Sequence, residues 1–94
     1  MIRHVIMWKF REGCEAEMQQ FLDGLRSLQG QISQIVEMEV GVDAAGKGNY
    51  DAALISTFRT WEDLETYKKD PRHVAVSSLC KSIRTDRVAV DFEF

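Results

Sequence analysis

The opening segment of the chain alternates strictly between two faces, and both faces carry large apolar side chains. The period of two over residues 2–10 is the signature of a β-strand. One face holds Ile2, His4, Ile6, Trp8 and Phe10, and the other holds Arg3, Val5, Met7 and Lys9. Because a layer of helices covers only one face of a sheet, the second apolar set needs a cover from outside the protomer. We therefore expect a sheet whose open face packs against a second subunit.

Along the rest of the chain, the spacing of the apolar residues changes several times between the period of a helix and that of a strand. After Gly13, apolar side chains recur at helical spacing from Met18 to Leu28, which predicts a helix that ends at about Leu28. Residues 35–42 and 50–58 alternate as two strands joined by a glycine-rich loop. A helix follows Thr60, Pro71 breaks it, and a further helix precedes a last strand. The last strand alternates through Val88, Val90, Phe92 and Phe94. The order β-α-β-β-α-β, with the second helical section split, predicts an α+β fold of the ferredoxin-like kind.

Size and composition narrow the class of protein. With 94 residues the chain has room for one domain, residues 1–94, and so small a domain buries only roughly 60–65% of its surface. The net charge is −3 and no basic run exceeds Lys68-Lys69, which argues against a nucleic-acid partner. No apolar stretch approaches the roughly 20 residues that cross a bilayer, so we expect no membrane partner and a cytoplasmic location.

The two cysteines give no sign of a metal or redox motif. Cys14 and Cys80 lie far apart without CxxC or Cys/His spacing. We therefore expect two free thiols, with Cys80 buried on a helix, and no cofactor that depends on them.

The segment from Tyr67 to Val74 carries the strongest sign of chemistry. Asp70-Pro71 is typical of a helix start, since the Asp carboxylate accepts free backbone N–H groups and proline has none to lose. His73 then lies in the first turn, where the helix dipole disfavours its protonated form. If the fold gathers His73, Tyr67 and His4 in one cavity, the chain has the groups for acid–base work on a small organic molecule.

Each of these residues also has a purely structural interpretation. His73 would then only pack and form a local hydrogen bond, and Tyr67 would be an amphipathic aromatic at the edge of the core. His4 would be a satisfied interior histidine on an apolar face. The strand aromatics, including Trp8 and Phe92, would line either a ligand pocket or the core of an interface.

Three segments together resemble a known family. They are His4-Val5-Ile6-Met7-Trp8-Lys9-Phe10, Asn49-Tyr50-Asp51 and Tyr67-Lys68-Lys69-Asp70-Pro71-Arg72-His73-Val74. The chain thus resembles the stress-responsive dimeric α/β-barrel domain over nearly its whole length. The resemblance implies a homodimer in which two four-stranded sheets meet face to face, with a pocket between each sheet and its helices.

The resemblance also implies functional residues. A plant polyketide cyclase of the family has its catalytic histidine and tyrosine at His73 and Tyr67, and a further pocket histidine at His4. Its pocket tyrosine falls near Leu25, which has no hydroxyl, so the pocket here is less polar. We expect the pocket to be lined by Ile6, Trp8, Leu25 and Phe92.

A metal site is a further implication of the resemblance. The main-chain carbonyls of Gln29, Ile32 and Ile35 fall where that cyclase holds an ion at the dimer contact. Carbonyl oxygens suit Mg²⁺ and leave no side-chain signature, so a structural Mg²⁺ would be the only cofactor.

Three functions remain open from the sequence. The first is a stress-associated dimeric barrel that binds a small organic ligand without an assigned activity, as for many members of the family. The second is a cofactor-free cyclase, isomerase or lyase with His73 as general base and Tyr67 and His4 as orienting groups. The third is a cofactor-independent monooxygenase, as in other dimeric α/β barrels.

Overall fold

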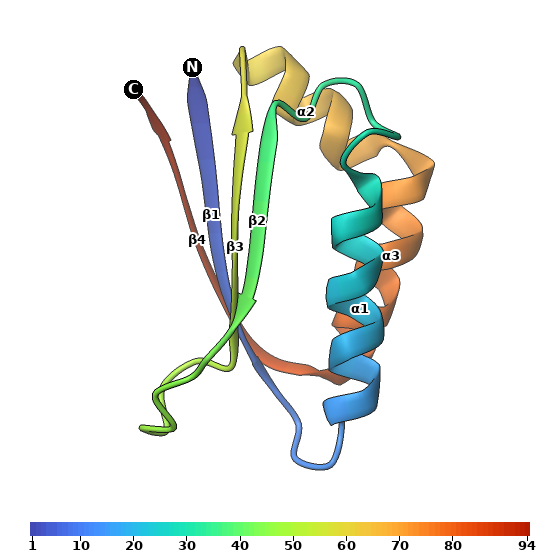
Figure 1. Cartoon of the computed structure of the whole chain (residues 1–94). Coiled ribbons are helices and arrows are strands. Elements are labelled where there is room, and N and C mark those ends of the chain that lie inside the picture. The colour runs from blue at the N-terminus through green and yellow to red at the C-terminus, as the bar shows by residue number, and fades with distance from the viewer.

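The computed structural model describes residues 1–94 as one four-stranded sheet with all three helices on the same face (Figure 1). Its elements are β1 (Ile2–Phe10), α1 (Glu15–Leu28), β2 (Glu37–Val42), β3 (Ala52–Phe58), α2 (Trp61–Lys69), α3 (Pro71–Ile83) and β4 (Arg84–Glu93). The strand order is β2-β3-β1-β4, and each neighbouring pair is antiparallel. This confirms the predicted ferredoxin-like arrangement with a split second helix.

Strands β2 and β3 begin two residues later than the sequence pattern predicts. Before β2, Ile35 donates its backbone N–H to the carbonyl of Ile32 at 3.2 Å, so the chain is still turning there. The regular ladder with β3 starts only where Glu37 pairs with Thr57. The predicted bounds 35–42 and 50–58 were therefore too long at their amino-terminal ends.

Of the two faces that the alternation separates on β1, the one that carries Ile2 and His4 lies against the helices. Ile2, Ile6 and Trp8 are buried there, together with His4. Helix α1 packs over them with its buried residues Met18, Phe21, Leu22, Leu25 and Leu28. Burying each of these large apolar side chains stabilises the fold by about 1.5–3 kcal/mol.

Strand β4 presents its apolar side chains to the open face of the sheet. In the register with β1, Val90 lies opposite Val5, Val88 opposite Met7, and Phe92 opposite Arg3. Val90 is 57% exposed, and Met7 and Phe92 are each 41% exposed. Figure 1 shows no element of the chain covering this face. The expectation that Phe92 lines the pocket was wrong, because the register turns it away from the helices.

The opposite side of β4 is polar and faces the helices. Arg87 lies opposite Trp8, Asp91 opposite His4, and Glu93 opposite Ile2. Glu93 accepts a hydrogen bond from the indole Nε1–H of Trp61 at 2.7 Å. The space between β4 and the helices is therefore lined by polar groups, unlike the apolar core over β1 and β3.

Two capped helix starts place the candidate site residues. The Thr60 hydroxyl accepts the backbone N–H of Asp63 at 3.0 Å and starts α2, which carries Tyr67. The Asp70 carboxylate accepts the backbone N–H of Arg72 at 2.8 Å, and Pro71 is the first residue of α3. Both predicted starts are confirmed, and His73 lies in the first turn of α3.

Two further sequence expectations concern the thiols and the helices. Cys14 and Cys80 are both free, and Cys80 is buried as expected. None of the three helices combines the length and the apolar character needed to cross a bilayer.

Replacing Thr60 with alanine should destabilise the protein without changing its fold. The variant loses the hydroxyl that caps α2, which costs about 1 kcal/mol of unfolding free energy. Thermal unfolding followed by circular dichroism should show a melting temperature lower by about 4–8 °C for a domain of this size. Ser33→Ala, at an exposed residue whose side chain makes no hydrogen bond, is the control and should melt like the wild type. Equal melting of the two variants would contradict the capping role.

Candidate active site between the sheet and the helices

A cavity of about 280 Å³ lies between the sheet and the helices. The residues that line it are His4, Ile6, Trp8, Phe21, Leu25, Leu54, Tyr67, Lys68, His73, Ser77, Cys80, Arg84 and Arg87. The fold thus brings together the three candidate catalytic residues His4, Tyr67 and His73. It also places Ile6, Trp8 and Leu25 at the cavity as expected, whereas Phe92 lies on the other face of the sheet.

His73 is held by the turn that joins α2 to α3. Its Nδ1 lies 3.2 Å from the backbone carbonyl oxygen of Lys68, which can only accept a hydrogen bond. Nδ1 therefore carries the proton and donates, which leaves Nε2 with a free lone pair. The ring also packs against Tyr67, with 4.3 Å between the ring centroids. The imidazole is thus oriented with a basic nitrogen available at the cavity.

The pKa of His73 is lowered from its ordinary value. The main cause is burial, and the positive charges of His4, when protonated, and Arg87 act in the same direction. The hydrogen bond to the Lys68 carbonyl and the charge of Asp70 oppose this shift. The direction agrees with the sequence prediction, but burial outweighs the helix start as its cause. At neutral pH the ring is uncharged and able to accept a proton.

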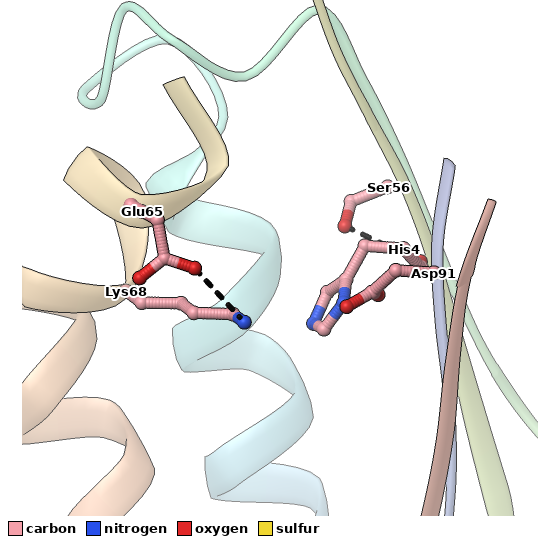
Figure 2. A network of polar contacts seen from close by, with 5 residues as sticks. All are labelled: His4, Ser56, Glu65, Lys68 and Asp91. Carbon is pink, nitrogen blue, oxygen red and sulfur yellow. Dashed lines mark hydrogen bonds and ion pairs between the residues drawn. The ribbon is translucent and has the colours of Figure 1, made fainter. Parts of the chain in front are cut away.

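His4 forms a pair with a carboxylate that the sequence analysis did not assign to the site. Its Nδ1 is hydrogen-bonded to Oδ1 of Asp91, the residue opposite it on β4. Figure 2 shows the His4 ring between this carboxylate and the Lys68 ammonium group, with the Ser56 hydroxyl near the His4 backbone. Ser56 donates to the His4 carbonyl at 3.5 Å. The Asp91 contact fixes the ring and leaves its Nε2 without a proton when the imidazole is neutral.

The pKa of His4 is also lowered, with burial as the largest cause. The hydrogen bond and the charge of Asp91 raise it, while the charges of Lys68 and Arg87 lower it further. Burial therefore outweighs the carboxylate partner, and the neutral form of His4 prevails at neutral pH.

Tyr67 contributes a hydroxyl that has no partner in the chain. The residue is 1% exposed, and its buried hydroxyl makes no hydrogen bond. Burial raises the pKa of Tyr67, so the hydroxyl stays protonated at neutral pH. A buried polar group without a partner costs about 1–3 kcal/mol. A ligand oxygen in the cavity would recover that energy by accepting this hydrogen bond.

Aromatic side chains form part of the cavity lining. Trp8 and Phe21 line it and meet edge to face, with 5.0 Å between the centroids. Phe58 is not a lining residue but packs on Tyr67 at the same distance. Such contacts fix ring orientation beyond simple burial. Trp8 and Phe21 therefore give the cavity a preformed apolar surface against which an organic ring or chain can pack.

Four charged residues of the site were missed from the sequence. Lys68, Arg84 and Arg87 line the cavity, and Asp91 orients His4. In the sequence, Asp91 belongs to an alternating set of acidic residues that is typical of a solvated face. The alternation of β4 could have indicated that Asp91 and Arg87 share one face of the strand. Only the register of β4 with β1 shows that this face lies towards the helices.

The proposed Mg²⁺ ligands lie together on the loop between α1 and β2. Gln29 and Ile32 form an isolated parallel β-bridge there, and the carbonyl of Ile32 accepts the backbone N–H of Ile35. No group of three or more His, Cys, Asp or Glu side chains gathers where it could hold a metal ion. Only hard carbonyl oxygens would bind the ion, as Mg²⁺ accepts. A metal at this loop stays a prediction.

Fold and site together define a small α+β domain of the ferredoxin-like kind, with a cavity beside the sheet. Residues 2–94 match the stress responsive A/B barrel domain family, abbreviated Dabb. The chain belongs to this family, which confirms the resemblance seen in the sequence. No curated protein matches the sequence significantly.

Solved structures share the fold. A dimeric protein of unknown function with a ferredoxin-like fold from Bacteroides fragilis is 28% identical, with a TM-score of 0.92 over 99% of this chain and 95% of its own. A dimeric ferredoxin-like protein of unknown function from Thermobifida fusca is 25% identical, with a TM-score of 0.88 over 99% and 90%. The hydroxynitrile lyase of Passiflora edulis is 15% identical, with a TM-score of 0.85 over 97% and 90%.

Both histidines should titrate below their ordinary pKa of about 6.5. Following the Cε1–H signals by NMR against pH should give lowered values for His4 and His73. In Asp91→Asn the pKa of His4 should fall further, because burial then acts without the carboxylate. His73, which Asp91 does not contact, serves as the internal control. A His4 pKa above 6.5 in the wild type would contradict the dominance of burial.

The same shifts fix the sign of the pH dependence of stability. Because both folded-state pKa values are lowered, the unfolded chain binds protons first as the pH falls. The contribution of the two neutral histidines to the free energy of unfolding is fully present above about pH 6.5 and decreases below it. Denaturant unfolding at several pH values would measure this decrease.

Proposed function

We propose that the cavity between the sheet and the helices binds a small organic molecule and transfers a proton to and from it without a cofactor. The observation that supports this most is the pair formed by His73 and Tyr67. A neutral imidazole with a free Nε2 stands beside a buried, protonated hydroxyl that has no partner. A base and a hydrogen-bond donor at one cavity are what proton abstraction next to a carbonyl needs.

The chemistry follows from the two groups. Nε2 of His73 takes a proton from a carbon next to a carbonyl, and the electron pair of that C–H bond moves onto the carbonyl oxygen. The Tyr67 hydroxyl donates a hydrogen bond to that oxygen as its negative charge develops. Return of the proton to another position completes an isomerisation. In a cyclisation the enolate carbon attacks a second carbonyl, whose π electrons move onto its oxygen, and the resulting alkoxide takes the proton back from the His73 imidazolium. The charges balance throughout without a metal or a redox partner.

His4 acts as a second basic group in this proposal. Asp91 holds its ring and accepts from its Nδ1, so its Nε2 is also an acceptor. A substrate hydroxyl or enol that donates to this nitrogen would be oriented against His73. The neutral state of His4 matters here, because a protonated ring would repel the proton that His73 takes up.

The lyase class is a second candidate. The hydroxynitrile lyase from Passiflora edulis shares the fold. Removing a hydroxyl proton needs the same free imidazole nitrogen that the structure shows on His73. Lyase substrates therefore belong in the assay set beside ketones and keto acids.

The open sheet face supports a homodimer. Solved relatives at 28% and 25% identity are described as dimeric. Met7, Val90 and Phe92 leave an apolar surface that isolated monomers rarely expose, and a second copy of the same face would cover it. The two free thiols suit a reducing compartment, so the proposed location is the cytoplasm.

Proton transfer can be tested without knowing the natural substrate. Phenylacetone and phenylpyruvate carry C–H groups next to a carbonyl, and NMR in D₂O measures how fast deuterium replaces these protons. The wild type should accelerate the exchange, and His73→Gln should lose about 10²–10⁴-fold of that acceleration. Tyr67→Phe should also slow it, whereas Tyr50→Phe, on the surface, should not.

Two outcomes would contradict parts of this proposal. Exchange in His73→Gln at the wild-type rate would remove His73 as the base. Binding of a probe without any accelerated exchange would leave the cavity as a binding site and refute the proton transfer.

The dimer has its own test. Sedimentation equilibrium at micromolar concentration should give twice the chain mass of 10.8 kDa. Val90→Lys places a charge on the open face and should shift the equilibrium towards the monomer. The control Val74→Lys changes a valine that is 49% exposed on α3, and it should stay dimeric. A wild-type mass of one chain would refute the assembly.

A further inference from the structure

Three cationic side chains gather at the cavity, and no acidic side chain lines it. Lys68 comes from α2, where its ammonium group pairs with Glu65 at 3.5 Å, and Arg84 and Arg87 lie within the first four residues of strand β4. The whole chain has 15 acidic and 12 basic residues, so this concentration of positive charge is opposite to the overall balance. Like charges held together repel one another unless an anion joins them.

The two arginines have no counter-ion within the protein. Neither guanidinium takes part in any of the ion pairs of the structure. Asp86, which lies between them in sequence, accepts instead from the Tyr50 hydroxyl and from the backbone N–H of Arg87, both at 2.8 Å. Asp91 is used by His4. The arginine side chains therefore remain available to a ligand.

The positive groups lie close to the two imidazoles. Arg87 is opposite Trp8 in the strand register, two steps along the same face from the pair of His4 and Asp91, with Ile6 and Ala89 between them. After burial, which is the largest cause, the charge of Arg87 contributes to the lowered pKa of both His4 and His73. Burial raises the pKa of the Cys80 thiol, so this lining residue adds no negative charge. An anion bound to Arg87 would thus sit beside the proposed base.

We propose that Arg84, Arg87 and Lys68 form an anion-binding subsite, and that the ligand of this cavity is a small carboxylate with an apolar body. The inference rests on the proposed function and specifies its substrate class. The carboxylate would meet the guanidinium forks, which match its two oxygens. The apolar body would pack against Trp8, Phe21 and Leu25. A cavity of about 280 Å³ is near the lower limit of ligand pockets, which limits the body to about one ring.

The structure favours a carboxylate over a phosphate. Phosphate sites commonly use backbone N–H groups at a helix start. At the start of α3, the Asp70 carboxylate already accepts the N–H of Arg72. Hydrogen bonds from the Arg72 side chain, the largest cause, lower the pKa of Asp70 to about 2, so it is charged at neutral pH. Side chains, and not the backbone at the helix start, would therefore bind the anion, which suits a planar carboxylate.

The test compares probes that differ only in the anion. Phenylpyruvate and its neutral analogue phenylacetone are titrated into the protein at low salt, and NMR or calorimetry gives the dissociation constants. The wild type should bind phenylpyruvate at least about tenfold more tightly, since charge-assisted hydrogen bonds contribute at that level. Arg84→Gln with Arg87→Gln should abolish the preference, because phenylpyruvate binding weakens by at least about tenfold relative to phenylacetone binding. Arg59→Gln, at an exposed arginine away from the cavity, should keep the preference.

The outcomes distinguish the subsite from the proposed proton transfer. Equal affinity for the two probes, or a preference that survives loss of both arginines, overturns the subsite while leaving the proposed cavity function intact. Tighter binding of phenyl phosphate than of phenylpyruvate overturns the carboxylate assignment. A carboxylate preference without accelerated hydrogen exchange supports the subsite and refutes proton transfer. Failure of every probe to bind overturns both proposals.

Discussion

The register between β1 and β4 is the constraint on which the rest of this structure depends. It sets His4 opposite Asp91 and Trp8 opposite Arg87, so that β4 turns its polar side towards the helices. The same register turns Val88, Val90 and Phe92 to the open face. A slip of one residue would exchange the two sides of the strand. One pairing thus creates both the polar cavity and the apolar surface that a second copy would cover.

The electrostatics of the cavity follow from this arrangement. Burial keeps both imidazoles neutral and keeps the Tyr67 hydroxyl protonated, while Asp91 and the Lys68 carbonyl fix the two rings. Neighbouring positive charge strengthens the effect of burial on the histidines. The result is a pair of basic nitrogens and a proton donor in one space, next to two arginines that take part in no ion pair. The family assignment gives the fold, and these groups are the basis of the proposed chemistry.

The sequence predicted those features that depend on local pattern. Alternation in residues 2–10, the Thr60 cap and the Asp70-Pro71 helix start each follow from neighbouring residues, and each is confirmed. The gathering of His4, Tyr67 and His73 in one cavity also agrees with the expectation. Phe92 was placed on the wrong face, and Asp91, Arg84 and Arg87 were missed. Their positions depend on pairing between segments more than 70 residues apart, which alternation alone does not determine.

The central claim is that His4 and His73 each present an unprotonated Nε2 to one cavity. Nitrogen-15 NMR of the two imidazoles near pH 7.5 measures this directly, because the shifts of Nδ1 and Nε2 differ between the tautomers. We expect both rings to be neutral and protonated at Nδ1, with Asp91 and the Lys68 carbonyl as acceptors. A ring protonated at Nε2, or a charged ring at that pH, would contradict it.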